Sequence, residues 1–201
     1  MTSGILRAYA DTLYGQVHYR HAGQGGPLLL LHQTASSSQQ FEPMMPTLAS
    51  RYHVLALDTP GYGMSDAQPS ECTISDYARS VVSFMDALGI EGTSIFWHHT
   101  GAGIACEVAA AYPNRVDALI LYGPPYWEIS PEVLDARNKP LLIKEDGSHL
   151  TEMWEDIIGR IREGLFPKPY SKDALNIIER EVLWKLMAGD RYVDGYRAVY
   201  R

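Results

Sequence analysis

The sequence has few cysteines, and its basic residues are neither in excess nor clustered. Cys72 and Cys106 are the only two cysteines among 201 residues, and we expect them in a loop and in a buried helix. This usage argues against a disulfide framework and favours a reducing compartment. The 17 Lys and Arg residues form no run and are outnumbered by 24 Asp and Glu, which gives a net charge of −7. That balance excludes the basic footprint of a nucleic-acid or anionic-membrane binder and favours a small or neutral partner.

Membrane and export signals are also missing. The aliphatic run 28–31 is too short to cross a bilayer. Residues 1–7 contain no apolar core of the kind that a secretory signal carries. We therefore expect a cytoplasmic location.

Apolar runs alternate with amphipathic stretches from Leu28 onward. Strands are expected in a hairpin at 6–22 and at 28–31, 52–57, 94–98 and 116–122. Helices are expected at 39–50, after a capping box at 73–76, and at 104–111. A strand covered on both faces reads as a continuous apolar run, as 28–31 does. The pattern predicts an α/β fold with a doubly wound, mostly parallel sheet.

Residues 94–103 form the stretch around which the other elements are arranged. They predict a short strand, a tight turn and the start of an Ala-rich helix, which stops at Tyr112-Pro113. A turn this sharp lifts one side chain above the sheet and points the first free amides of the helix at the same place. That geometry suits a nucleophile and a developing oxyanion. We expect Thr100 to be the side chain presented.

Two motifs resemble those of the α/β-hydrolase superfamily. Residues 98–102, His-His-Thr-Gly-Ala, resemble the nucleophile elbow Gly-x-Ser-x-Gly, with Thr in place of Ser and with His and Ala in place of the two Gly residues. Residues 58–65 match Asp-x-Pro-Gly-x-Gly-x-Ser, which is typical of hydrolases with a separate cap and has a structural role there. This second match is the stronger one.

The resemblance implies a set of site residues. Thr100 is the implied nucleophile, and the amides of Thr34 and Gly101 are the implied oxyanion hole, with Gln33 where Gly is usual. The implied substrate pocket is lined by His32, Gln33, His99, Tyr126, Trp127 and Trp154. No cofactor is expected. The adjacent His98 and His99 point to opposite sides of an extended chain, so they do not indicate a metal site.

The resemblance also divides the chain. Residues 1–125 correspond to the N-terminal part of the hydrolase core and residues 126–201 to a helical cap, within which 140–143 is a strand-like run. A hydrolase of this type continues past its cap with two more strands that bring the triad acid and histidine. We therefore expect the C-terminal strands in a further segment or a second chain that completes the sheet.

The implied function is a hydrolase that acts by nucleophilic acyl transfer. Its substrate would be an ester, lactone, thioester or amide with an apolar acyl part. The altered elbow keeps an alternative open, a non-hydrolytic relative that binds a small apolar ligand or guides a reaction without a covalent step. A dinucleotide-binding protein is a third hypothesis, since Gly101-Ala102-Gly103 follows a strand, but the full Gly-x-Gly-x-x-Gly pattern fails at Glu107 and its surroundings.

Overall fold

The computed structural model describes residues 4–67, 72–123, 130–137, 139, 141–161 and 169–200. The strands are β1 (Leu6–Thr12), β2 (Gly15–Ala22), β3 (Gly26–Leu31), β4 (Tyr52–Leu57), β5 (Thr93–His98) and β6 (Val116–Tyr122). The α-helices are α1 (Met45–Leu48), α2 (Ile74–Ala87), α3 (Gly101–Ala111), α4 (Pro131–Arg137), α5 (Ser148–Ile161), α6 (Lys172–Ala188) and α7 (Asp194–Tyr200). Three short 3-10 helices are η1 (Ser38–Phe41), η2 (Pro113–Arg115) and η3 (Gly189–Val193).

The six strands form one sheet in the order β1-β2-β4-β3-β5-β6. The first two strands make the expected antiparallel hairpin, and β2 pairs antiparallel with β4. From β4 to β6 all pairings are parallel, with β3 in the centre. The expected mixed, mostly parallel sheet is confirmed.

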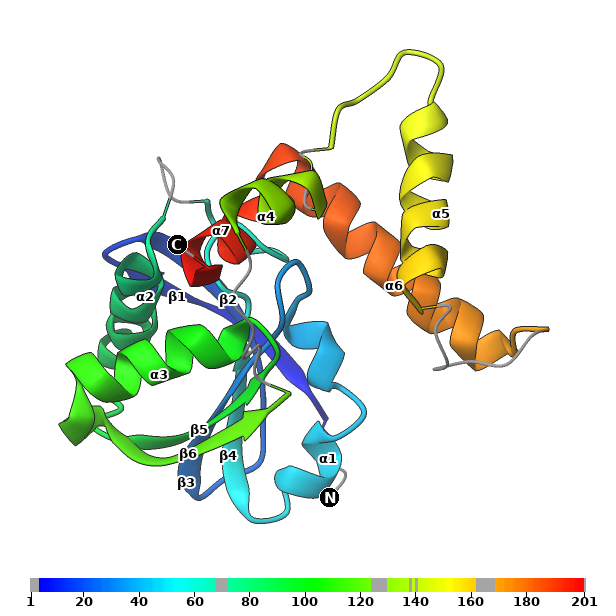
Figure 1. Ribbon diagram of the computed structural model, residues 1–201. Coiled ribbons are helices and arrows are strands. Elements are labelled where there is room, and N and C mark those ends of the chain that lie inside the picture. Colours follow the sequence, from blue (N-terminus) through cyan, green and yellow to red (C-terminus); the bar gives the residue numbers. More distant parts are fainter. Residues whose placement is uncertain are drawn as a thin grey trace.

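Helices cover both faces of the central strands. On one face α2 and α3 lie side by side, and on the other lie η1 and α1 (Figure 1). Leu29 and Leu31 belong to the larger hydrophobic cluster, which includes residues of α2 and α3, whereas Leu28 and Leu30 pack with Phe41 and Met45 on the other side. The unbroken leucine run is therefore explained by burial on both sides of β3.

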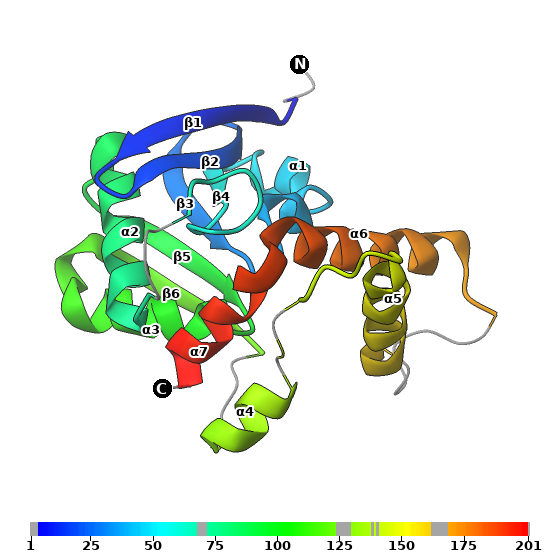
Figure 2. The ribbon, with the colours of Figure 1, turned by 90° about the horizontal axis from the view of Figure 1, so that it is seen from above.

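The helices after β6 extend away from the sheet and then return to it. The helices α5 and α6 pack together beyond the sheet, and α6 leads back to α7, which lies near α2 (Figure 2). The α6 helix begins at an N-cap, where the Ser171 hydroxyl accepts a hydrogen bond from the Ala174 amide. The predicted boundary at residue 125 lies outside the described residues.

Three local expectations are corrected by the structure. The helix expected at 39–50 is split into η1 and α1, because Pro43 and Pro46 lack the N–H groups that a continuous helix needs. The described part of the strand-like run, 141–143, forms no strand. Cys106 lies on the exposed side of α3, since Ala105 and Val108 occupy the buried side, and neither cysteine forms a disulfide with the described residues. None of the helices among the described residues is both long and apolar enough to span a bilayer.

Candidate active site

The turn between β5 and α3 is made at His99. His99 has φ 56°, and it is the single non-glycine residue with positive φ in the described part of the chain. Its amide donates to the carbonyl of Tyr122 at 3.0 Å, which ties the turn to the end of β6. His tolerates this left-handed conformation far better than a β-branched residue does. The elbow therefore presents His99, one residue before the expected position.

Thr100 follows the elbow inside the protein. It has φ −60° as the N-cap of α3, and its side chain is fully buried. The Thr100 hydroxyl oxygen accepts a hydrogen bond of 2.8 Å from the amide of Thr34. This corrects the expectation that the turn lifts Thr100 above the sheet. It also brings together the two threonines that the sequence placed in one site.

Gly101 is required at the start of α3 by close packing. A Cβ atom at Gly101 would lie 2.5 Å from Cε3 of the buried Trp97 ring and 3.0 Å from the carbonyl oxygen of His32. If Gly101 is the last Gly of Gly-x-Ser-x-Gly, then His99 occupies the position of the Ser. The sequence therefore contained a signal for the observed turn.

The His99 imidazole is partly exposed, and one of its nitrogens is buried without a partner. Within the described residues, Nδ1 has no solvent contact and no hydrogen bond. The ring centroid lies 6.3 Å from that of His98. Desolvation by burial lowers the pKa of His99 below its usual value of 6.5. The elbow therefore carries a neutral imidazole at neutral pH.

His98 is held by neighbours that the sequence did not reveal. The Gln40 side-chain amide donates to Nδ1 of His98 at 2.9 Å, and the His98 ring stacks on Tyr122 with centroids 5.3 Å apart. Burial, and then the nearby His99, lower the pKa of His98. No sequence pattern linked Gln40 to the elbow, because Gln40 and His98 are 58 positions apart in the chain.

His32 is buried and bonded through both ring nitrogens, and its place in the substrate pocket stays a prediction. It is 2% exposed. Nδ1 donates to the carbonyl of Gln33 at 2.8 Å, and Nε2 accepts from the amide of Thr59 at 3.0 Å. Burial lowers the pKa of His32, although Asp58 and the bond to Gln33 act in the opposite direction. This neutral ring fixes the loop after β3 to the loop after β4.

The Asp58 carboxylate organises the turn at 58–66 from within. It accepts hydrogen bonds from Nδ1 of His18 at 2.8 Å and from the amides of Ser38 and Met64 at 2.5 and 2.9 Å. Burial alone would raise the pKa of Asp58, but these bonds and the nearby His32 outweigh it and lower the pKa to about 2. The structural role predicted for this motif fits its buried bonding.

The helices α6 and α7 touch the loop that follows β3. The Gln33 side-chain amide donates to Glu181 of α6 at 3.1 Å, and the Tyr196 hydroxyl of α7 donates to the carbonyl of Thr34 at 2.8 Å. Burial raises the pKa of Glu181, against the effects of Lys185, Gln33 and Arg180. Of the remaining expected pocket residues, Trp154 packs partly buried against the main hydrophobic cluster. Tyr126 and Trp127 lie outside the described residues.

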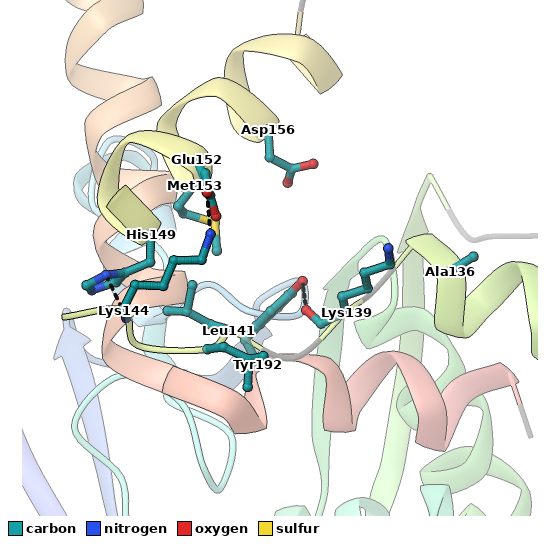
Figure 3. A pocket seen from close by; sticks show the side chains of 10 residues that line it. Ala136, Lys139, Leu141, Lys144, His149, Glu152, Met153, Asp156 and Tyr192 are labelled. Atoms are coloured by element: carbon teal, nitrogen blue, oxygen red, sulfur yellow. Dashed lines mark hydrogen bonds and ion pairs between the residues drawn. The ribbon is translucent and has the colours of Figure 1, made fainter. Parts of the chain in front are cut away.

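A cavity of about 410 Å³ lies among the helices after β6 (Figure 3). It is lined by Ala136, Lys139, Leu141, Leu142, Lys144, His149, Glu152, Met153, Asp156 and Tyr192. Several of its polar groups pair with one another, since Lys144 binds Glu152 and the Tyr192 hydroxyl donates to the carbonyl of Lys139 at 2.6 Å. None of the expected site residues lines it. Across the described ranges, no three His, Cys, Asp or Glu side chains are grouped so as to hold a metal ion.

Comparisons with known proteins agree with this geometry. Residues 26–145 match the family model of the alpha/beta hydrolase fold. A putative non-heme haloperoxidase of Mycobacterium phage D29 is 35% identical over 100 residues, which cover 49% of this chain and 36% of the relative. A haloalkane dehalogenase of Agrobacterium fabrum is 27% identical over 190 residues, which cover 84% of this chain and 62% of the relative. The chain thus spans less than two thirds of these relatives.

Solved structures show the same fold. A hydrolase from Pseudomonas aeruginosa superposes with a TM-score of 0.75 at 20% identity, over 96% of this chain and 72% of the other. An N-acyl homoserine lactonase superposes with a TM-score of 0.70 at 22% identity, over 98% of this chain and 70% of the other. Together with the family match to more than half of the sequence, the strand, sharp turn and helix at His99 lead to one conclusion: the chain belongs to the α/β hydrolase fold family.

Proposed function

We propose that the protein is a hydrolase that cleaves an ester, lactone, thioester or amide with an apolar acyl part. The observation that carries the proposal is the positive φ of His99 at the end of a parallel strand, directly before the N-terminus of α3. Strained backbone of this kind clusters at active sites, where it aims a side chain at the substrate. The family membership supports the same class of reaction.

The oxyanion of the reaction would be bound beside the elbow. The first amides of a helix have no intrahelical acceptor. The amide of Ala102 already donates to the carbonyl of His99, so the amides of Thr100 and Gly101 are the ones proposed to bind the oxyanion. The Thr100 hydroxyl accepts from Thr34, so its own hydrogen is the one it can donate. In this proposal Thr100 acts as an oxyanion donor polarised by Thr34, rather than as the nucleophile.

The helices after β6 would form the cap that shapes the substrate pocket. The contacts Gln33–Glu181 and Thr34–Tyr196 support this role, because they link α6 and α7 to the loop that borders the elbow. Apolar and aromatic residues of these helices would select an apolar acyl part. The substrate would be a small molecule.

A further polypeptide segment or a second chain would pair with β6. This strand is an edge of the described sheet, because it pairs with β5 on one side only. Its Ile120 and Tyr122 side chains are 50% and 63% exposed. An apolar edge strand is a template for another strand. That segment would bring the acid and the general base that complete the site.

The alternative is binding of a small apolar ligand without a covalent step. This alternative is favoured because the Thr34 amide, an expected oxyanion donor, already donates its hydrogen bond to the Thr100 hydroxyl. Turnover distinguishes the two functions. The full-length protein should hydrolyse p-nitrophenyl esters, with kcat/KM rising from acetate to longer acyl chains. Binding of the same acyl chains without release of p-nitrophenol would establish the alternative and reject the hydrolase.

A further inference from the structure

The elbow of this protein carries an imidazole where its fold family commonly carries a hydroxyl. His99 alone has the positive φ of the turn, and Thr100 is buried with its oxygen occupied by the amide of Thr34. We infer that His99 is the nucleophile of the proposed hydrolase, attacking the substrate through Nε2. The inference rests on the proposed function and names the side chain that performs its first step.

The backbone conformation supports a functional reason for His99. Positive φ costs free energy at any residue with a side chain, and a glycine would avoid that cost at this position. Nine of the described glycines do adopt positive φ elsewhere in this chain. A histidine kept at the tip of the turn therefore indicates that its side chain is needed there.

The surroundings of the ring determine which nitrogen reacts. Nδ1 is buried and meets no partner among the described residues, so a substrate does not reach the ring through that nitrogen. A neutral imidazole carries one proton and one lone pair. The inferred attack requires the proton on Nδ1, which leaves the lone pair on Nε2.

The reaction can then be written in two balanced steps. The Nε2 lone pair forms a C–N bond to the carbonyl carbon, the bond from that carbon to the leaving oxygen breaks, and the leaving group departs as an anion. The acylated ring is cationic and keeps its proton on Nδ1. Water then adds to the carbonyl carbon, the C–N bond breaks, the carboxylic acid and one proton are released, and the neutral imidazole returns.

Thr100 and the helix fit this chemistry. The carbonyl oxygen becomes an anion next to the Thr100 hydroxyl, which the Thr34 amide polarises, and above the N-terminus of α3. A threonine hydroxyl in this place stabilises charge without itself attacking. His99 thus takes the role expected of Thr100, and Thr100 becomes an oxyanion donor.

Chemical rescue tests the inference. His99→Gly removes the imidazole and suits the positive φ, so the fold should be kept, and His99→Asn gives a second variant that tolerates the same backbone. The matched control is His53→Asn, because His53 is a partly buried histidine near the start of β4, at the opposite end of the strands from the elbow. Hydrolysis of p-nitrophenyl acetate by the full-length proteins is measured with and without added imidazole.

We expect both His99 variants to lose at least about 100-fold in kcat, the scale of a missing catalytic group. Added imidazole should raise the rate of His99→Gly above the sum of the protein and imidazole rates, and it should not do so for His53→Asn. If His99→Gly keeps the turnover of the wild type, the inference is overturned, but the proposed hydrolase function stands. A full-length wild-type protein that releases no p-nitrophenol would overturn both.

Discussion

The amide of Thr34 donates a 2.8 Å hydrogen bond to the hydroxyl of Thr100, joining the loop after β3 to the N-cap of α3. Both residues are buried, and Thr100 is fully so. The bond occupies the amide that we expected in the oxyanion hole. It leaves the Thr100 hydroxyl hydrogen for another acceptor, which in the proposed mechanism is the substrate oxygen.

Thr100→Val should separate the effect of the Thr100 hydroxyl from the effect of the side-chain shape. Val fills the same volume but leaves the Thr34 amide unpaired, which costs about 1–3 kcal/mol of unfolding free energy. The lost donor should also lower kcat by about 10²-fold to 10³-fold. Urea unfolding and ester hydrolysis measure the two effects.

Thr100→Ser is the matched control, because it keeps the hydroxyl. We expect stability within about 1 kcal/mol of wild type and most of the activity. Equal activity in the Val and Ser variants would remove the hydroxyl from the mechanism.

Gly101→Ala should be among the most damaging small substitutions in the chain. The new methyl would lie 2.5 Å from the Trp97 ring, whose position in β5 is fixed by full burial. We expect a loss of about 1–3 kcal/mol from overpacking and a displaced elbow with little turnover. Thermal unfolding and the ester assay check both.

Gly159→Ala provides the comparison for that substitution. Gly159 lies within α5, and a methyl there meets nothing within 4 Å. Because Ala is the better helix former, we expect a gain of about 0.5–1 kcal/mol. A similar loss in both alanine variants would contradict the packing argument at Gly101.

Stability should fall in acid through Asp58. The folded-state pKa is lowered to about 2 from the usual 3.8, so the carboxylate stabilises the fold above pH 3.8 and loses that contribution as the pH falls towards 2. The contribution is about 2 kcal/mol. Urea midpoints from pH 5 to pH 2 should show this loss.

Asp58→Asn should remove much of that pH dependence and destabilise the protein already at pH 7, since the amide cannot accept all the bonds that the carboxylate accepts. Asp11→Asn is the control, because Asp11 binds Gln16 at an exposed site. If Asp58→Asn kept the wild-type acid slope, another group would be responsible for it.

The rate of hydrolysis should stay high on the acid side of neutrality. Burial lowers the pKa of His99 below 6.5, so the neutral imidazole persists as the pH falls through that value. We expect the midpoint of the acid limb of kcat/KM to lie below pH 6.5, where the ring takes up a proton. A pH–rate profile with its acid limb above 6.5 would contradict this assignment.

Amide exchange should report whether another strand covers β6. In the full-length protein we expect slow deuterium exchange at β6 amides on both sides of the strand, because the proposed segment pairs with its outer side. The comparison is β1, the opposite edge of the described sheet, whose outer amides should exchange quickly. Fast exchange at the outer amides of β6 would reject the proposed pairing.

Most of the fold could be predicted because its signals are local. The Leu28–Leu31 run indicated a strand buried on both faces, and the Thr73 capping box marked the start of α2, as observed. The helix expected at 39–50 was wrong where two prolines interrupt it. Patterns of burial and capping depend on neighbours in the sequence, and they transfer well to the structure.

The site was predicted less completely, because it depends on one dihedral angle and on contacts distant in sequence. The motif placed the turn within one residue, yet that residue decides whether His99 or Thr100 is presented. The bonds of Gln40 to His98, of Glu181 to Gln33 and of Tyr196 to Thr34 span from 58 to 162 positions. No local pattern records such pairs.

The most direct test of the account is a crystal structure of the full-length protein with an alkyl boronic acid, whose boron accepts a nucleophile in a tetrahedral adduct. We predict a bond from Nε2 of His99 to boron, with a boronate oxygen within hydrogen-bond distance of the Thr100 hydroxyl. An adduct on Thr100, or a boronic acid bound away from the elbow, would contradict the account.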